Sequence, residues 1–453
     1  MNIDNLYTIS PIDGRYSEMT KEIREYFCEY ELIKNRVLVE IEWMITLSEN
    51  SNIKELNLNK EEIEKLRKLY INFSKEDADR VKEIEDSTKH DVKAIEYFIR
   101  EKAKELNLEK VISFIHFGCT SEDINNLTYG IMVRDMINKA WLVHAKELIE
   151  IVKQSAKELK SIPMLSHTHG QSATPTTVGK ELSVFVYRWK SVLEFLEKIN
   201  LKGKLNGAVG NFNSFEIAYP NIDWISLSKS FVESLGLEYN PYTTQIESHD
   251  TLVMLLNMVQ SFNMITMDFN SDMWIYISTG YFNQKVVKNE VGSSVMPHKV
   301  NPINHENSMA NIRLSNSYIN SFATNLPVSR MQRDLSDSSM LRNIGVAIAH
   351  SLISIKQTKI GFKKMSVNKE LLEKELNDNP EILAEAIQTV LRKNEIDNAY
   401  EILKEKTRGK KLLLEDLKEW IETLEISEED KDRLKQLTPL NYIGLAEKLT
   451  QLL

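Results

Sequence analysis

The sequence predicts an all-α protein, because residues that strands and turns need are scarce and long segments with helical periodicity are frequent. Of 453 residues, 15 are glycine and 10 are proline, about 3% and 2%, near half of average usage. The longest periodic segment covers residues 122–160, and such a helix extends about 60 Å at about 1.5 Å per residue. That length exceeds a single small core, so we expect an extended helical bundle.

The composition limits the class of protein. The formal charge of −9, with no compensating basic block, disfavours a nucleic-acid surface. Cys28 and Cys119 are the only cysteines, which is typical of a reducing cytosol. No basic region followed by an apolar run begins the chain, and apolar runs such as residues 344–349 are far shorter than a membrane span. We therefore expect a soluble cytoplasmic protein with no nucleic-acid or membrane partner.

Apolar spacing and breaker residues divide the chain into helices and polar loops. The expected helices span residues 22–48, 122–160, 177–199, 249–281, 303–325 and 339–361, with short charged helices before residue 85, a helix opened at residues 89–91, and short helices after residue 363. Polar segments between them include residues 117–123, 166–175, 203–213, 239–245, 292–302 and 329–338. The expected domains are residues 1–111, 112–362 and 363–453. Binding residues are expected on the loops, which a rigid scaffold holds.

The loop at residues 292–302 reads Gly-Ser-Ser-Val-Met-Pro-His-Lys-Val-Asn-Pro. Asn301 suits the N-cap of the following helix and Pro302 its first position, and a helix N-terminus favours an anion. Lys299 adds a positive charge at the same place. Ordinary surface loops that end in a cap have a similar composition, so composition alone leaves both interpretations open.

Histidines mark two further polar segments. A histidine at a helix start, as at His90, is commonly a satisfied polar residue. His169 lies in Thr-His-Gly-Gln between breaker residues, where an imidazole can donate or accept a proton. A metal site on His167 and His169 is disfavoured, because no third ligand lies at helical or hairpin spacing. Walker A and dinucleotide-binding motifs are absent from the sequence, so we expect no metal and no cofactor.

Arg333, Ser338 and Arg342 place two guanidinium groups and a hydroxyl within ten residues. Ser338 and Arg342 are four residues apart and would share a helix face. Arginine is the preferred residue for binding phosphate, although a salt-bridged, solvated face would have the same composition.

The loop at residues 292–302 resembles the signature of the fumarase/aspartase superfamily, G-S-S-x-M-P-x-K-x-N-P, at every fixed position. Further strings are similar to those of the bacterial long-form adenylosuccinate lyases, in order along nearly the whole chain: S-P-I-D-G-R-Y, K-H-D-V-K-A-I-E-Y-F, T-S-E-D-I-N-N-L, T-H-G-Q, N-G-A-V-G-N, N-P-Y-T-T-Q-I-E, Q-R-D-L-S-D-S and T-R-G-K. This resemblance implies a central five-helix bundle in a cytoplasmic homotetramer with active sites shared between subunits.

The resemblance also implies a reaction and its residues. The reaction would be an anti β-elimination of fumarate from adenylosuccinate, giving AMP, and from succinyl-aminoimidazole-carboxamide ribotide (SAICAR), giving AICAR. Ser293 would be the base and His169 the general acid, with His90 in support. Lys299 and Asn301 would hold the substrate's carboxylates. Residues that would bind the nucleotide are Arg15, Tyr16, Gln245, Arg333, Ser338 and Arg342, and residues that would border the succinyl and purine parts are Lys89, His90, Asp91, Thr120 and Ser121, with Asn307 close by.

Three positions depart from the family pattern. Lys89 stands where asparagine or arginine is commoner, His167 replaces an arginine, and Ser172 replaces a proline. None of them is a predicted proton-transfer residue. A sister lyase acting on argininosuccinate or a fumarase is the alternative within enzymes, which the arginine cluster disfavours because those substrates carry no phosphate. A non-catalytic helical assembly protein is the alternative outside enzymes, which the intact Ser293, His169 and Lys299 disfavour.

Overall fold

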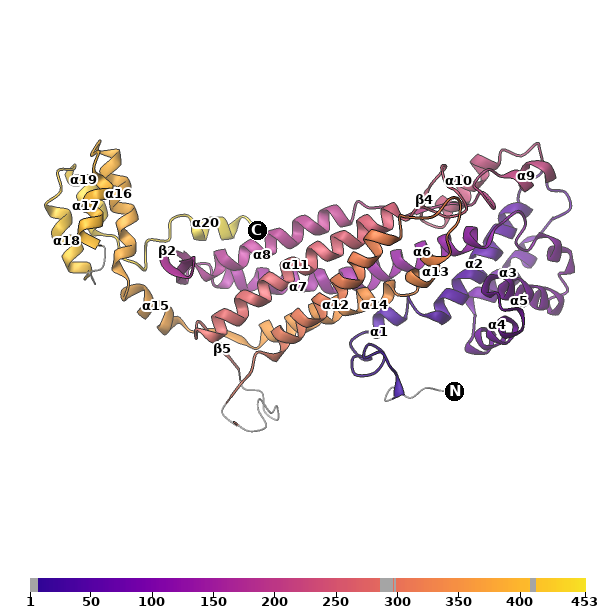
Figure 1. The fold of residues 1–453 in the computed structure, drawn as a ribbon, viewed down its shortest axis with the longest axis horizontal. Coiled ribbons are helices and arrows are strands. Elements are labelled where there is room, and N and C mark those ends of the chain that lie inside the picture. Colours follow the sequence, from indigo (N-terminus) through magenta and orange to yellow (C-terminus); the bar gives the residue numbers. More distant parts are fainter. Residues whose placement is uncertain (1–6, 286–295, 297–298, 408–412) are drawn as a thin grey trace. The chain divides into compact units, whose positions relative to one another are not determined.

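The computed structural model describes residues 7–285, 296, 299–407 and 413–453, and these residues are mainly helical (Figure 1). The described strands are short, and the longest has seven residues. The predicted all-α class is therefore confirmed.

The chain divides into two compact units, one of residues 1–145, 192–264 and 309–356 and the other of residues 146–191, 265–308 and 357–453. The three-domain division of the sequence stays a prediction.

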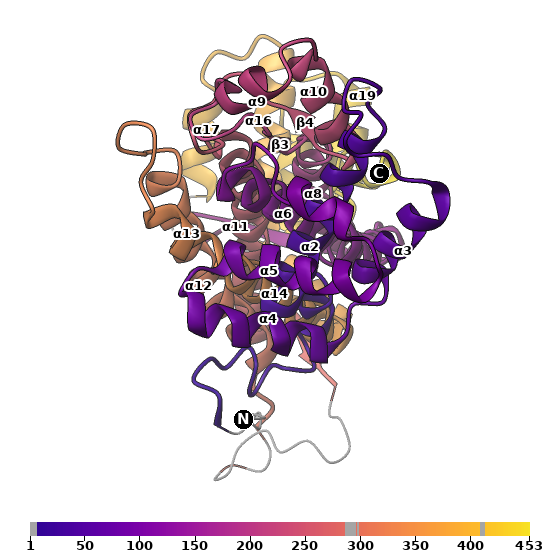
Figure 2. The same cartoon turned by 90° about the vertical axis from the view of Figure 1, so that its right-hand side faces the viewer.

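The first unit begins with short helices around a long one. Its elements are α1 (Lys21–Arg24), α2 (Glu29–Ser48), α3 (Lys60–Ile71), α4 (Lys75–Thr88), α5 (Asp91–Glu105), a 3-10 helix (Glu109–Phe114), α6 (Ser121–Met136), a π-helical turn (Ile137–Trp141), β3 (Lys202–Gly203), α9 (Asn213–Ala218), α10 (Trp224–Ser234), β4 (Glu238–Tyr239) and α13 (Ser336–Leu341). Helices α4 and α5 lie side by side (Figure 2). Asn59 and Ser74 begin α3 and α4 with capping boxes, which satisfy backbone donors that a helix start leaves unpaired.

Five long helices contribute residues to both units: α7 (Leu142–Glu158), α8 (Val178–Leu196), α11 (Asp250–Ser278), α12 (Ile303–Asn325) and α14 (Ile344–Lys363). Helix α12 has the predicted bounds, and the segment predicted at 122–160 is helical from 121 to 158 with the π turn inside it. Two predicted helices are interrupted. The one predicted at 22–48 is broken between α1 and α2, and the one predicted at 339–361 is broken between α13 and α14.

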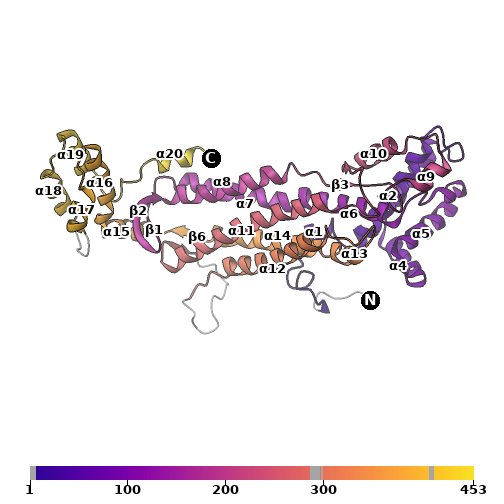
Figure 3. The same cartoon turned by 45° about the horizontal axis from the view of Figure 1, so that its top comes forward.

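The second unit also contains β1 (Pro163–Thr168), β2 (Gln171–Thr177), β5 (Phe282–Gln284), β6 (Met365–Val367), α15 (Lys369–Asn377), a 3-10 helix (Pro380–Leu383), α16 (Ala384–Lys393), α17 (Ala399–Thr407), α18 (Leu414–Glu422), α19 (Glu428–Lys435) and α20 (Ala446–Gln451). Strands β1 and β2 form an antiparallel hairpin (Figure 3), where the sequence predicts only a loop. Helices α16 to α19 enclose a core of their own, which includes Ile387, Leu391, Leu417 and Ile421.

Each unit has an aromatic core. In the first, the buried Trp43 ring lies 5.1 Å from the Phe231 ring and 6.0 Å from the Phe215 ring, centre to centre. In the second, the buried Trp189 ring lies 5.2 Å from the Phe269 ring, and its Nε1 donates to Thr266 Oγ1 at 3.1 Å. Large aromatic side chains with a satisfied polar end are well suited to the interior of a bundle.

Helix α11 is long and apolar enough to cross a membrane, with a mean hydropathy of 1.2 over its most apolar window. The sequence prediction that no segment reaches that length therefore overlooked it. Half of this window is buried inside the structure, and the fully buried Asn263 and Asn270 hydrogen bond to neighbouring helices. Amides paired in this way are typical of a core helix.

Candidate active site

The signature loop is described only in part. Ser293, the predicted base, lies outside the described residues, whereas Lys299 is described and exposed. The backbone N–H of Lys299 donates to the Met296 carbonyl at 3.1 Å, and the Gln284 side chain donates to the Val300 carbonyl at 2.8 Å. Lys299 is thereby held between β5 and α12, and it brings a cation to the start of a long helix.

The helix after this loop has its expected bounds, but its N-cap lies one residue later than expected. The backbone N–H of Glu306 donates to the Pro302 carbonyl at 3.3 Å, so Pro302, and not Asn301, is the cap residue. Asn301 and the further predicted ligand Asn307 are both half-buried. The α12 N-terminus still offers backbone donors beside Lys299, which favours a carboxylate there.

His169 occupies a two-residue hairpin turn. Thr168 pairs with Gln171, which leaves His169 and Gly170 between the strands. Their φ angles are 55° and 74°, and a type I′ turn requires positive φ at both positions. His169 is exposed, so a paired scaffold presents its imidazole to solvent. This placement suits a proton donor.

His167, one of the departures from the family pattern, packs within the same unit. Its ring centre lies 6.1 Å from that of Tyr281, and the Tyr281 hydroxyl hydrogen bonds to the Glu375 carboxylate. Ser172, another departure, pairs with His167 across the hairpin and is exposed. The two departures therefore lie on the hairpin that carries His169.

Asp91 and Arg342, both predicted to contact substrate, meet in the first unit. Arg342 Nη2 lies 3.1 Å from Asp91 Oδ2, and Arg342 Nη1 lies 2.6 Å from Glu29 Oε2. The same Asp91 oxygen lies 2.7 Å from Nη2 of the buried Arg36. Burial raises the pKa of Asp91, but Arg36 and Arg342 outweigh this effect and the pKa is lowered. Asp91 is thus an anion that holds two guanidinium groups.

His90 and Lys89 lie at the junction of α4 and α5. His90 is the N-cap of α5, and its Nδ1 accepts from the Lys93 backbone N–H at 3.2 Å. Both His90 and Lys89 are exposed, and Lys89 has a φ of 54°. His90 is therefore a satisfied polar residue at a helix start, which is the ordinary alternative given for it, and its capping hydrogen bond occupies only one of the two ring nitrogens.

Arg333 lies in a buried cluster of ionisable groups. Its Nη1 lies 3.2 Å from Asp337 Oδ2 and 3.3 Å from Glu122 Oε2. His249 Nε2 lies 3.4 Å from the same Asp337 oxygen. Burial raises the pKa of Glu122 to about 7, although Arg333 lowers it. Burial lowers the pKa of His249, but the Asp337 hydrogen bond and the nearby carboxylates raise this pKa by more than burial lowers it. The net shift of the pKa is therefore upward.

The remaining predicted residues of the first unit fall into small groups. Gln245 adjoins the Arg333 segment, because its backbone N–H donates to the Gln332 carbonyl at 3.2 Å. Ser338 lies on α13, whose C-cap is Arg342. The Thr120 backbone N–H donates to Asp123 Oδ2 at 2.8 Å, just before Ser121 opens α6. Arg15 is exposed beside the Tyr16 ring, 6.0 Å from its centre.

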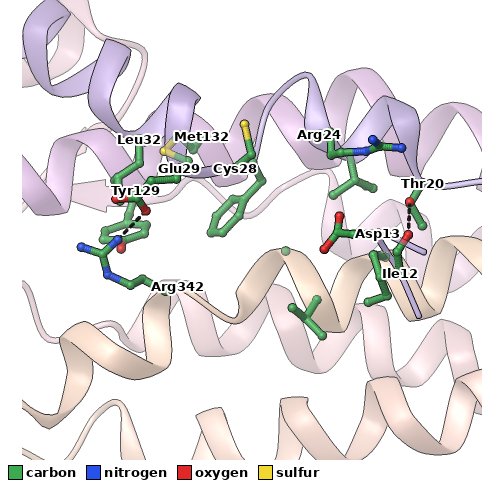
Figure 4. Close-up of a pocket in the computed structure, with 15 residues that line it drawn as sticks. Ile12, Asp13, Thr20, Arg24, Cys28, Glu29, Leu32, Tyr129, Met132 and Arg342 are labelled. Atoms are coloured by element: carbon green, nitrogen blue, oxygen red, sulfur yellow. Dashed lines mark hydrogen bonds and ion pairs between the residues drawn. The ribbon is translucent and has the colours of Figure 1, made fainter. Parts of the chain in front are cut away.

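A cavity of about 260 Å³ adjoins Arg342. Figure 4 shows Arg342 and Glu29 at one end and Asp13 and Arg24 at the other, with the side chain of Cys28 between them. Asp13 belongs to the same N-terminal segment as Arg15 and Tyr16. Arg342 and the N-terminal segment, which are both predicted to bind the nucleotide, therefore line or adjoin the same cavity.

The sequence did not single out several charged residues of this region: Glu29, Arg36, Glu122, Asp123, Lys204, His249 and Asp337. Of these, two carry a local signal: Asp337 lies four residues after Arg333, and Asp123 lies three residues after Thr120 in a capping-box pattern. Within the described ranges, no group of three His, Cys, Asp or Glu side chains is placed to hold a metal ion.

Comparison with known proteins identifies the family. A lyase family model matches residues 14–314, and a model described as adenylosuccinate lyase C-terminal matches residues 329–443. The chain is 48% identical to the adenylosuccinate lyase of Escherichia coli K12, over 98% of each chain, and 46% identical to that of Haemophilus influenzae, over 100% of this chain and 99% of the other. The fold is similar to a fumarate lyase from Mesorhizobium sp. BNC1, with a TM-score of 0.76 at 18% identity over 95% and 96% of the two chains. The chain therefore belongs to the adenylosuccinate lyase family of fumarate-releasing enzymes.

Proposed function

We propose that the chain eliminates fumarate from adenylosuccinate, giving AMP, and from SAICAR, giving AICAR. The observation that carries this proposal is the 48% identity to an adenylosuccinate lyase along 98% of the chain. Arg333 and Arg342 add support, since both are held by carboxylates in the first unit. Guanidinium groups held in this way suit a substrate with a phosphate. Argininosuccinate and malate carry none.

The proposed chemistry uses one base and one acid. Ser293 removes the proton from the succinyl carbon next to a carboxylate, and the electron pair enters that carboxylate as an aci-anion. Lys299, Asn301 and nearby amides stabilise the charge as it develops. The carbon–nitrogen bond then breaks, His169 protonates the departing purine nitrogen, and fumarate leaves. His90 supports this step, and the exposed hairpin turn leaves the His169 imidazole accessible to substrate.

The remaining predicted residues bind substrate in this proposal. Arg15, Tyr16, Gln245, Arg333, Ser338 and Arg342 bind the nucleotide, and Lys89, His90, Asp91, Thr120, Ser121 and Asn307 border the succinyl and purine parts. No cofactor or metal takes part, because the serine base, the imidazole acid and the lysine account for each charge that moves.

We further propose a cytoplasmic homotetramer with active sites shared between subunits. Three of the long helices support this, since α8, α11 and α12 expose large apolar side chains that include Tyr187, Phe195, Met254, Met264 and Leu314. Apolar groups of this number on long helices are typical of surfaces that a partner covers.

The substrate is tested by mixing the purified protein with adenylosuccinate, argininosuccinate or malate and measuring fumarate. We expect fumarate from adenylosuccinate alone. Fumarate from argininosuccinate or malate alone would support the proposed elimination but contradict the proposed substrate. No fumarate from any of the three, with a folded oligomer, would favour the assembly protein.

A further inference from the structure

Arg333 is held by one corner of its guanidinium group. Its Nη1 contacts Asp337 at 3.2 Å and Glu122 at 3.3 Å, and within the described part of the chain its Nε and Nη2 donate no hydrogen bond. We propose that Glu122 and Asp337 are positioning residues, which fix Arg333 so that its Nε–Nη2 edge is presented to the anionic end of the substrate.

The rigid shape of the guanidinium group makes this positioning effective. Nη1 lies on the side of the planar group opposite the Nε–Nη2 edge, and that edge carries two parallel N–H bonds that match a phosphate or carboxylate. Two carboxylates lie against Nη1: Asp337 on α13 accepts a hydrogen bond from it, and Glu122 on α6 forms an ion pair with it, so rotation of the group is restricted. The Arg333 side chain is 23% exposed, so its free edge can reach a ligand while its fixed corner is covered.

The burial of both acids indicates a role beyond stability. Glu122 and Asp337 are 4% and 6% exposed, and one oxygen of each, Glu122 Oε1 and Asp337 Oδ1, is buried with no partner among the described residues. Burying two acids for one guanidinium group costs more than burying a single pair, and the raised pKa of Glu122 reflects this cost. A second acid on Nη1 is therefore poorly explained by stability and well explained by orientation.

His249 completes the cluster from a third segment of the chain. Its Nε2 lies 3.4 Å from the Asp337 oxygen that also contacts Arg333, and the ring is buried. The charged groups that face Glu122 are Arg333, Asp337, His249 and Lys204. His249 is a second basic group beside Asp337, so the Asp337 carboxylate keeps a basic neighbour when Arg333 turns its free edge to an anion.

This inference rests on the proposed function, in which Arg333 binds the nucleotide's phosphate. The test is steady-state kinetics on adenylosuccinate with Glu122→Gln, Asp337→Asn and Arg333→Ala, alone and combined. We expect each acid variant to raise KM about tenfold or more with kcat nearly unchanged. A less firmly held Arg333 side chain weakens binding of the ground state and of the transition state equally. In the Arg333→Ala background, neither substitution should raise KM further.

The combined variants separate positioning from a structural role. The inference would be overturned if an acid substitution raised KM by the same factor in the Arg333→Ala background as in the wild type. It would also be overturned if the acid variants lowered kcat and left KM unchanged. If Arg333→Ala raises KM and the acid variants do not, the positioning inference fails while the proposed phosphate contact stands. If Arg333→Ala leaves KM unchanged, the phosphate contact itself fails.

A matched control exists in the same unit. Arg80 is also flanked by two carboxylates, with Nη1 2.9 Å from Glu83 and Nη2 2.7 Å from Glu101, on the exposed surface. Glu101→Gln should leave both kcat and KM unchanged. Glutamine and asparagine are isosteric with the protonated acids that they replace, and thermal unfolding of every variant checks that it is folded; either acid variant alone, if folded, tests the inference.

Discussion

Lys204 Nζ lies 2.9 Å from Asp123 Oδ1, and both side chains are fully buried. Asp123 also accepts the backbone N–H groups of Thr120, Asn206 and Gly207 at 2.8, 2.9 and 3.1 Å. One carboxylate thereby joins the start of α6 to the link after β3. Thr120 is a predicted substrate contact, so this pair connects the stability of the first unit to the shape of the site.

The two halves of this ion pair should not be equally costly to remove. Asp123→Asn leaves the Lys204 ammonium buried without an anion, which should cost about 3–5 kcal/mol. Lys204→Met leaves a carboxylate that still accepts three backbone N–H groups, so its loss should be smaller. Urea unfolding at one protein concentration measures both. Equal losses, or a larger loss for Lys204→Met, would contradict this account.

Gly179 lies where the start of α8 crosses the end of α7. A Cβ atom there would lie 2.3 Å from the Ala156 carbonyl oxygen and 2.5 Å from the Lys160 Cα. Backbone atoms cannot move aside as a side chain can. Gly179→Ala should therefore lower the free energy of unfolding by about 1–3 kcal/mol through overpacking, despite the better helix propensity of alanine. Thermal unfolding checks this, with the exposed Glu194→Ala on the same helix as control. A stabilised Gly179→Ala variant would refute the close packing.

His305 should make stability fall in mild acid. It is 1% exposed, and its Nδ1 lies 2.7 Å from Asn270 Oδ1. Burial lowers the pKa of His305 from 6.5 to about 4. Below pH 6.5 the unfolded chain binds a proton that the folded chain does not, so the free energy of unfolding falls as the pH falls. The decrease levels off below about pH 4 and amounts to about 3 kcal/mol in total.

The measurement is the free energy of unfolding between pH 7 and pH 4 for the wild type and for His305→Gln. The variant should lose less stability over this range, because it lacks the titrating group. Carboxylates and the other histidines contribute to both proteins and cancel in the difference. Parallel curves for the two proteins would show that His305 is not buried in its neutral form.

The proposed tetramer depends on apolar side chains that the bundle helices expose. Tyr187 on α8 is 68% exposed, and a charge there should oppose association because burying it would cost desolvation energy. Light scattering should give a tetramer for the wild type and smaller species for Tyr187→Glu. Tyr400→Glu, at a 56% exposed position on α17, should remain tetrameric. A monomeric wild type would refute the assembly.

The sequence predicts those features that depend on local pattern. Helix α12 has its predicted bounds because apolar spacing and Pro302 mark it clearly. The hairpin around His169 was missed because its strands are short and its turn has histidine where Asn, Asp or Gly is usual. The contacts of Arg333 with Glu122 and of Lys204 with Asp123 join distant parts of the chain. No local pattern encodes such pairs, so only the fold reveals them.

The measurement that tests the central claim most directly is turnover of adenylosuccinate by the wild type, Ser293→Ala and His169→Ala, with fumarate and AMP both quantified. The account predicts one fumarate per AMP from the wild type. It also predicts losses in kcat of about 10²–10⁴-fold or more in each variant, while adenylosuccinate still binds. A wild type that releases no fumarate, or a variant with a near-normal kcat, would contradict it.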